Sequence, residues 1–524
     1  MKACRVLICM LVLSVVLAGC GGVGGTANDI AKPAPMVRGQ VSQTNNPQVA
    51  LYTISSPSDA AVTVKFGKDT NYGLHTWAQK TPPGGGSVSI LVAGMQATTT
   101  YHMQADVEFA NGTKAVDADH TFTTGDVPAN LPSLTVTTTA GMTPQPGVEL
   151  IDDVFGGTPT AAFVTDLSGN VIWAYAVPDG QTGSTLYPIK QLPNGDFVLL
   201  TAPQSQSALQ SPVSDGTLNV IREIDLTGKT IKELRMSDLN ARLAAGFNNL
   251  KLQAFHHDIT PLPNGHWLVL ANTLKQFTGL AGLPGTTNVL GDVVVDLDPN
   301  LQPVWVWNSF DQLDVNRHPY NFPDWTHANA VVYSPDDGNI LVSLRHQNWI
   351  VKIDYRDGTG TGNVLWKLGP GGDFKLQGGT DPTDWFYAQH DPEFFSQNTT
   401  GVFSLGIMDN GDDRILQNNL QCGTSGAPAC YTTVQVLQVD DHGMTANLQF
   451  HRIMPPDLYS FFGGNVDLLK NGNVEYNLAA VGPDAYVVEV TQESSPQTVW
   501  QMHIFGTNTY RALRLSSLYP GVQW

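Results

Sequence analysis

The stretch that decides the fold reads HDITPLPNGHWLVL and spans residues 257–270. It places one apolar segment before a Pro-Asn-Gly turn and a second apolar segment directly after it. Gly in such a turn adopts the positive φ that a tight hairpin needs. The stretch therefore predicts two antiparallel strands joined by a short turn.

Related stretches recur along the chain. They begin at Tyr187, His257, His327, His390 and Gly464, which lie 70, 70, 63 and 74 residues apart. Further strand-like segments lie between them, and an opening unit spans residues 148–175. Six units of four strands indicate a six-bladed β-propeller over residues 140–524. A large array of β-sandwiches without radial closure is the alternative.

The composition supports an all-β chain. The 524 residues include 51 Gly and 33 Pro, and only 14% of them are charged. Coiled coils, helical repeats and disordered chains have more charge or less apolar content than this. The net charge of −19, without a run of Lys and Arg, argues against nucleic acid as a partner.

Residues 36–126 predict a small separate β-sandwich, with another all-β arrangement as the alternative. Strand-like segments alternate there with turns, and Tyr101 opens one of them in a manner that resembles a fibronectin type III domain. The preceding residues 20–35 are rich in Gly, Ala and Pro, which predicts a linker. The segment shows no cluster of chemically active residues, so we expect a spacer or docking role.

Residues 1–19 predict a lipoprotein signal peptide. Lys2 and Arg5 precede an apolar run that ends in Leu-Ala-Gly followed by Cys20. Such a box is typical of bacterial lipoproteins, in which the Cys is acylated, and an ordinary secretory signal is the alternative. Both interpretations predict an exported protein. The first predicts a periplasmic protein that its lipid anchors to a membrane.

Two cysteines remain beyond Cys20. Cys422 and Cys430 lie eight residues apart, around a short Gly- and Ala-rich loop. In an exported protein, a pair this close in sequence predicts a disulfide, with two free thiols as the alternative.

Three successive repeat units open with histidine, at His257, His327 and His390. Because equivalent positions of propeller blades lie at equivalent depth, we expect these imidazoles to converge at the mouth of the central channel. Nothing about the start of a strand requires His, so the register indicates a functional site. Zinc or iron ligation is an alternative use, with Asp258 and Asp391 as supporting acceptors.

Arg345 is predicted on the strand next to that of His327. A guanidinium near three imidazoles disfavours a bound cation and favours a tetrahedral oxyanion, with an arginine paired to a structural carboxylate as the alternative. Asn329 lies two residues past His327, so strand alternation turns it the same way, towards a substrate oxygen. The same alternation turns His346 and His256 away, and we leave both out of the predicted site.

Aromatic residues near the histidine strands are candidates for packing a substrate ring, with core packing as the alternative for each. They are Phe255, Trp325, Trp385, Phe386 and Tyr387.

As a group, Trp-Thr-His-Ala-Asn at 325–329, Leu-Arg-His-Gln at 344–347 and Gln-His-Asp at 389–391 resemble the motifs of bacterial arylsulfotransferases. The resemblance covers residues 140–520. It implies a small N-terminal β-domain, a six-bladed propeller and a short disulfide loop, here the pair Cys422 and Cys430. It also implies an arylsulfate-dependent reaction that does not use 3′-phosphoadenosine-5′-phosphosulfate. We expect no cofactor and no metal.

The resemblance also implies roles for the predicted site residues. His390 would be the nucleophile that becomes sulfated, while His257, His327 and Arg345 would hold the sulfuryl group and move protons. Asn329 would contact the substrate. The donor would be an aryl sulfate and the acceptor a phenol, in a ping-pong reaction through a sulfohistidine.

Two other function classes stay open at this level. A metal-dependent propeller hydrolase or lactonase would need carboxylates in the channel, for which residues 409–413 are the candidate, although they are more simply a turn. A non-catalytic propeller could scaffold an envelope complex. The sequence leaves open the natural substrates, the oligomeric state, the membrane that holds the anchor, and which of His257 and His327 is the acceptor base.

Overall fold

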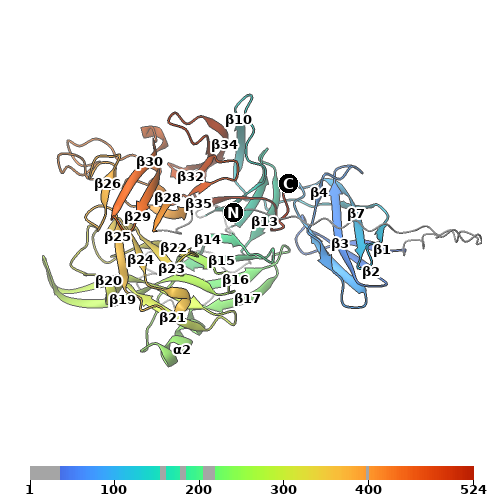
Figure 1. The fold of residues 1–524 in the computed structure, drawn as a ribbon, viewed down its shortest axis with the longest axis horizontal. Helices are drawn as coiled ribbons and strands as arrows, with labels where there is room; N and C mark the ends of the chain where they lie inside the picture. Colours follow the sequence, from blue (N-terminus) through green and yellow to red (C-terminus); the bar gives the residue numbers. More distant parts are fainter. Residues whose placement is uncertain (1–35, 154–160, 178–183, 204–218, 397–400) are drawn as a thin grey trace, which may run out of the picture.

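The computed structural model describes residues 36–153, 161–177, 184–203, 219–396 and 401–524. The predicted signal peptide at 1–19, the linker at 20–35 and the predicted lipidation residue Cys20 lie outside the described residues. Strands dominate what is described, which confirms the prediction of an all-β fold (Figure 1). No helix within the described ranges is long and apolar enough to span a bilayer.

Two antiparallel sheets form the N-terminal end of the described chain, drawn in blue in Figure 1. The first contains β1 (Arg38–Gln43), β2 (Ala50–Ser56) and β6 (Gly86–Val92). The second contains β3 (Ala60–Gly67), β4 (Leu74–His75), β5 (Gln79–Lys80), β7 (Thr100–Phe109), β8 (Lys114–Val116) and β9 (His120–Thr123). Alternate residues of β2, β3 and β7 are buried, as expected where each strand faces a shared core on one side.

Six further sheets follow, each with four or five strands. The first sheet contains β11 (Val148–Asp153), β12 (Ala161–Asp166), β13 (Val171–Ala176) and β35 (Thr509–Leu515). The second contains β14 (Ser184–Gln191), β15 (Phe197–Pro203), β16 (Val220–Ile224) and β17 (Thr230–Arg235). The third contains β18 (Phe255–Pro261), β19 (Trp267–Leu280), β20 (Leu283–Leu297) and β21 (Pro303–Asn308). The fourth sheet contains β22 (Ala328–Ser334), β23 (Asn339–Leu344), β24 (Trp349–Ile353) and β25 (Val364–Leu368). The fifth contains β26 (Lys375–Gln377), β27 (His390–Phe394), β28 (Val402–Asp409), β29 (Thr433–Asp440) and β30 (Thr445–Ile453). The sixth contains β10 (Ser133–Thr138), β31 (Val466–Leu468), β32 (Val474–Val481), β33 (Asp484–Val490) and β34 (Thr498–Phe505).

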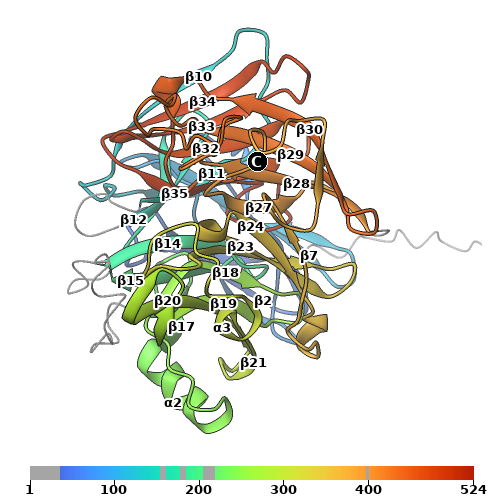
Figure 2. The same cartoon turned by 90° about the vertical axis from the view of Figure 1, so that its left-hand side faces the viewer.

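Neighbouring sheets touch through their first strands. Contacts link β11 to β14, β14 to β18, β18 to β22, β22 to β27 and β27 to β31, and β32 then contacts β35 of the first sheet. Figure 2 shows the sheets in this succession, from green at the bottom to red at the top. The last strand, β35, pairs with β11, while β10 pairs with β34, so both ends of the segment are tied into sheets formed by the other end.

The Pro-Asn-Gly hairpins form as the sequence predicts. Asn264 Oδ1 accepts from the N–H of His266 at 3.0 Å, and the N–H of Gly265 donates to the Leu262 carbonyl at 2.9 Å. Gly265 has φ +83°, which L-residues with a side chain rarely adopt. The same turn recurs at Gly195 and Gly472, with φ of +85° and +87°.

Within the described residues the helices are short and lie in connections. They are α2 (Met236–Gly246) and α3 (Ser309–Gln312), with the 3-10 helices η2 (Arg345–Gln347), η3 (Arg356–Gly358) and η4 (Pro456–Leu458).

The C-terminal tail joins the N-terminal sheets to the six-sheet segment. The Tyr519 hydroxyl donates to the Leu91 carbonyl and accepts from the N–H of Ala93, both at 2.8 Å. The Trp524 indole donates to the His75 carbonyl at 3.0 Å. One buried apolar cluster runs from the N-terminal sheets through Tyr519 into the first two sheets of the segment, so the two parts share a core.

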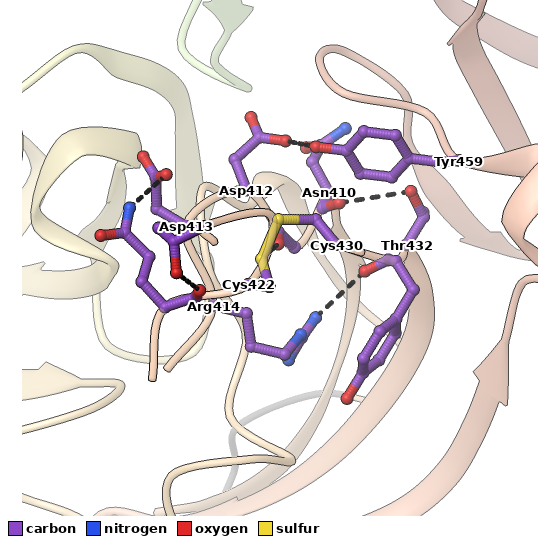
Figure 3. Close-up of a disulfide and its surroundings, with 12 residues drawn as sticks. Asn410, Asp412, Asp413, Arg414, Cys422, Cys430, Thr432 and Tyr459 are labelled. Atoms are coloured by element: carbon purple, nitrogen blue, oxygen red, sulfur yellow. Dashed lines mark hydrogen bonds between the residues drawn. A yellow bond between two sulfur atoms is a disulfide. The ribbon is translucent and has the colours of Figure 1, made fainter. Parts of the chain in front are cut away.

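Cys422 and Cys430 form a disulfide, with their Cα atoms 4.9 Å apart. The disulfide packs against the turn after β28, where Cys422 Sγ lies 3.4 Å from the Gly411 carbonyl (Figure 3). That turn carries Asn410 and Asp412, which contact His390 and Arg345 in the wall of the cavity described below.

We expect Cys422→Ser to lower stability and leave activity intact at moderate temperature. Loss of a crosslink over so short a loop costs about 2–3 kcal/mol through the gain in unfolded-state entropy. Thermal unfolding followed by circular dichroism, with Cys430→Ser as the matched variant, measures the change. Loss of activity in a variant that still melts cooperatively above the assay temperature would contradict a purely structural role.

Candidate active site

A cavity of about 260 Å³ opens where the inner strands of several sheets meet. Its walls contain Tyr187, His256, His257, Asn272, Leu290, Asp292, Asp324, His327, Arg345, His390, Phe461, Phe462 and Tyr510. The three histidines predicted from the repeat register, and the predicted arginine, therefore lie in one cavity.

Each of the three histidines lies in or next to an irregularity of the first strand of its sheet: His257 lies within β18, His390 begins β27, and His327 directly precedes β22. The strand registers shift between Phe255 and Ile259, between Ala328 and Ala330, and between His390 and Glu393. A bulge adds a residue on one strand and re-aims the side chains beside it, and such bulges are common at functional sites. The shared irregularity explains how three strand starts turn imidazoles towards one point.

Backbone conformation and ring distances agree with this picture. His257 and His327 have φ of +58° and +47°, and Asp391, next to His390, has +42°. The ring centroids of His257 and His327 lie 4.7 Å apart. Tyr510 lies between the histidines, with its ring 5.6 Å from His257 and 5.9 Å from His390.

His390 is buried, with one ring nitrogen held by an amide. Its Nδ1 lies 2.6 Å from Asn410 Oδ1, and its Nε2 lies 3.3 Å from the backbone nitrogen of Gly463. Burial, followed by the positive charge of Arg345, holds the pKa of His390 well below the ordinary value of 6.5. The imidazole is therefore neutral at neutral pH and keeps the lone pair that a nucleophile needs.

His257 makes its closest contact with its neighbour in sequence. Nδ1 of His256 and Nδ1 of His257 lie 2.9 Å apart, and Nε2 of His256 lies 3.0 Å from Asp292 Oδ1. Burial, and next the charge of His327, hold the pKa of His257 well below 6.5. His256 thus lies in the cavity wall, contrary to the alternation argument, because the bulge at His257 interrupts the regular strand.

His327 is paired with a carboxylate. Its Nδ1 lies 2.6 Å from Asp324 Oδ2, which belongs to the loop before β22. Burial alone would raise the pKa of Asp324, but the charge of His327 and their hydrogen bond hold it below its ordinary value. A carboxylate at Nδ1 orients the imidazole ring, an arrangement common around histidines that act in acid–base catalysis.

The sequence predicted Arg345 on a strand, but Arg345 instead begins the 3-10 helix η2. Its guanidinium donates to Asp412 Oδ2 and, at 2.7 Å, to Nε2 of His346. Asp412 in turn accepts from the Tyr459 hydroxyl (Figure 3). The buried Nε of Arg345 has no hydrogen-bond partner among the described residues, and Arg345 is part of the cavity wall.

His346 belongs to this group, although the alternation argument left it out. In a 3-10 turn, successive residues do not point to opposite faces, and the His346 ring lies 4.5 Å from that of His327. Its Nδ1 lies 2.8 Å from the Asp324 carbonyl. Burial, and next the charge of His327, lower the pKa of His346 to about 3.

Asp324, His327 and His346 are close enough to suggest a metal site. The hydrogen bonds argue against it. Because a guanidinium can only donate, Nε2 of His346 is the acceptor for Arg345, and Nδ1 must carry the proton that it donates to the Asp324 carbonyl. A cation would have to displace that proton beside a fixed positive charge.

Three other residues considered from the sequence lie deeper. Asn329 is fully buried and is not part of the cavity wall; its amide donates to the Gln389 carbonyl at 2.6 Å. The bulge beside Asn329 breaks the alternation that predicted a shared face with His327. Its contact with a substrate stays a prediction. Asp258 and Asp391 both pair with the buried Arg511, at 2.9 and 2.7 Å, instead of supporting a histidine.

The cavity aromatics differ from the sequence candidates. Phe255, Trp325, Trp385, Phe386 and Tyr387 are buried in the cores between sheets. The cavity wall instead holds Tyr187, Tyr510 and the adjacent pair Phe461 and Phe462, which follow η4. Tyr187 opens a repeat unit, so its position in the repeat could have predicted a place in the cavity wall. The positions of the other three depend on long-range packing.

The acidic stretch at 409–413 has cationic partners. Asp409 binds the buried Arg414 and accepts from Thr433 at 2.6 Å, while Asp412 binds Arg345. Guanidinium groups of the described structure therefore balance the charge of these two carboxylates. The two carboxylates give no support for the calcium site of a propeller hydrolase.

Neutral imidazoles, a guanidinium with one unpartnered donor and an apolar wall define a site suited to transferring a tetrahedral anionic group attached to a ring. A family model described as Arylsulfotransferase (ASST) matches residues 134–511. The chain belongs to the arylsulfotransferase family.

A search of curated proteins finds no match. Among solved structures, hydrazine synthase from Kuenenia stuttgartiensis is 11% identical, with a TM-score of 0.26, over 66% of this chain and 90% of that one. A member of the DUF4221 family from Bacteroides vulgatus is 7% identical, with a TM-score of 0.31, over 74% of this chain and 98% of that one. A variant of the NanB sialidase from Streptococcus pneumoniae is 9% identical, with a TM-score of 0.26, over 89% and 68%.

Proposed function

We propose that this chain moves a sulfuryl group from an aryl sulfate to a phenol through a sulfohistidine at His390. The observation that carries the proposal is the neutral, buried His390 imidazole in one cavity with Arg345 and its unpartnered Nε donor. Sulfuryl transfer spreads charge over oxygens, as phosphoryl transfer does, so a positioned guanidinium favours the transition state.

The reaction has two halves. In the first, Nε2 of His390 attacks sulfur, the bond from sulfur to the phenolic oxygen breaks, and the leaving phenolate takes a proton from a protonated histidine. In the second, the acceptor phenol returns a proton to that histidine, its oxygen attacks sulfur, and the sulfur–nitrogen bond breaks. His390 is then regenerated, with no net change in protons.

The size of the cavity supports one shared site for donor and acceptor. A cavity of about 150 Å³ is enough for benzene, and this cavity measures about 260 Å³. It has room for one aryl group with its sulfate, so the first phenol must leave before the second enters. Leu290, Phe461 and Phe462 supply the apolar wall for that ring.

Initial rates with p-nitrophenyl sulfate and phenol test the function. Parallel lines in double-reciprocal plots, unchanged by a chelator, are expected for ping-pong transfer. Intersecting lines would contradict a covalent intermediate. A requirement for added metal would favour the hydrolase or lactonase alternative, and no turnover with any aryl sulfate would favour a scaffold.

We assign the acid–base role to His327. Asp324 stabilises its protonated form, whereas His257 contacts only another imidazole at Nδ1 and is held neutral by burial. This pairing of an imidazole with a carboxylate that orients it is common in general acid–base catalysis.

Asp324→Asn should lower kcat with phenol as acceptor by about 10²-fold, the usual scale for general acid–base catalysis. The first half-reaction with p-nitrophenyl sulfate should fall much less, because p-nitrophenolate is a good leaving group whose departure depends little on proton donation. Single-turnover and steady-state rates separate the two. Asp337→Asn, which removes a carboxylate paired with Lys352 outside the cavity wall, is the control. Equal losses in both halves would contradict the assignment.

The six sheets are proposed to be the blades of a propeller, and the two N-terminal sheets a fibronectin-III-like sandwich. The succession of contacts between first strands and the pairing of β35 with β11 support closure of a ring. The shared apolar core between the two N-terminal sheets supports a sandwich.

The protein is proposed to be a periplasmic lipoprotein anchored through Cys20, on the strength of the Leu-Ala-Gly-Cys box. Cys20→Ser should abolish lipid labelling and release the protein from the membrane fraction. A variant that is correctly processed and still fractionates with membranes would contradict the anchor.

A further inference from the structure

We propose that Asn410 is a positioning residue that holds His390 in the one tautomer able to act as a nucleophile towards the cavity. The inference rests on the proposed function, because it concerns how His390 is prepared for attack. Asn410 follows β28, while His390 begins β27, so the pair joins adjacent strands of one sheet.

The orientation of the Asn410 amide follows from its own partners. The side chain is fully buried, and its Nδ2 donates to the carbonyls of Ser460 and Gly463, at 2.9 and 3.1 Å. A flipped amide would point its oxygen at two carbonyl oxygens. Oδ1 therefore faces His390, where it can only accept.

The tautomer of His390 follows from the amide. Nδ1 lies 2.6 Å from Oδ1, so it must carry the proton, and Nε2 keeps the lone pair. The N–H of Gly463 points at Nε2 from 3.3 Å, which is consistent with an unprotonated nitrogen. The segment that contains Ser460 and Gly463 therefore orients the Asn410 amide and also contacts Nε2 of His390.

An amide suits this position better than a carboxylate. A carboxylate at Nδ1 would stabilise the imidazolium, which has no lone pair at Nε2, whereas an amide oxygen supports the neutral ring. The charged or titratable groups that act on His390 from the other elements are Arg345 in η2, His327 before β22, His257 in β18, and Tyr510 and Arg511 in β35. Apart from the Tyr510 phenol, these groups disfavour a positive charge on the His390 ring.

A buried asparagine directly before β16, in another part of the fold, provides a matched control. Asn219 is also fully buried; its Nδ2 donates to the Gln253 carbonyl and its Oδ1 accepts from the N–H of Phe255, both at 2.9 Å. Asn219 is not part of the cavity wall. Substitution there reports the loss of a buried amide that joins two strands, without the imidazole.

The test follows the sulfation of His390 by mass spectrometry in single turnovers with p-nitrophenyl sulfate, as a function of pH. Asn410→Ala should slow sulfation by at least about 10²-fold across the pH range, the direction seen when an imidazole loses its tautomer. Asn410→Asp should recover much of the rate at high pH, with the acid limb moved upward by at least about one pH unit. A protonated His390 cannot attack, so a higher pKa moves the loss of activity to higher pH.

Three outcomes are distinguishable. A wild-type protein that is not sulfated at His390 would overturn the proposed function itself. Sulfation in the wild type, with Asn410→Ala no slower than Asn219→Ala, would overturn the role of Asn410. The role of Asn410 would also be overturned if the acid limb of the pH–rate profile lies at the same pH in Asn410→Asp and in the wild type. The position of this limb does not depend on equal stability of the variants.

Discussion

His390→Asn should lower kcat by at least about 10³-fold, the scale expected when a covalent nucleophile is removed. Asn is polar and of similar reach, but its amide nitrogen has no available lone pair to attack sulfur. The loss should appear in the first half-reaction as well as in steady-state turnover. His266→Asn is the matched control, because His266 pairs with Asp296 at 2.9 Å and is not part of the cavity wall.

The same experiment locates the intermediate. Wild-type protein incubated with an aryl sulfate and no acceptor should gain one SO₃ on the peptide that contains His390, and phenol should remove it. A mass shift on a peptide containing His257 or His327 would reassign the nucleophile. No adduct, together with turnover that depends on added metal, would contradict the sulfotransferase mechanism.

Arg345→Lys should lower kcat/KM by about 10²-fold, which is less than His390→Asn, on the scale of losing one positioned donor to the transition state. Lys keeps the charge but has no planar fork, so it cannot contact Asp412, His346 and a sulfuryl oxygen together. The unpartnered Nε is the donor that the substitution removes.

Steady-state and single-turnover rates with a series of aryl sulfates measure this effect. Arg222→Lys is the matched control, since Arg222 forms a forked contact with Glu233 at 2.9 and 3.1 Å outside the cavity wall. Wild-type rates for Arg345→Lys would contradict a role for the guanidinium fork. A larger loss than in His390→Asn would indicate that Arg345 holds the site together instead of binding the anion.

The sequence was sufficient to predict the gathering of His257, His327, His390 and Arg345. The repeat register of the three histidines is a local pattern, and equivalent strands of successive sheets place equivalent residues at one end of the fold. Arg345 was predicted separately, from its position shortly after His327 in the chain. The Pro-Asn-Gly hairpins were predictable for the same reason, because turn conformation depends on a few adjacent residues.

The residues that were missed share one cause. His256 and His346 were excluded by strand alternation, but a bulge at His257 and a 3-10 turn at Arg345 interrupt the regular strand. A bulge arises from the fit between paired strands, and a single strand's sequence carries little sign of it.

Sequence by itself determined the strand-rich class, the repeat and the candidate reactive groups, because these depend on residue type and local periodicity. Tertiary structure alone decided the chemical state of those groups. Nδ1 of His327 lies against the Asp324 carboxylate, and Nδ1 of His390 lies against the amide of Asn410, 20 residues further along the chain. Arg345 meets Asp412 across 67 residues. Protonation, tautomer and donor availability depend on burial and on partners from distant segments, which only the folded chain brings together.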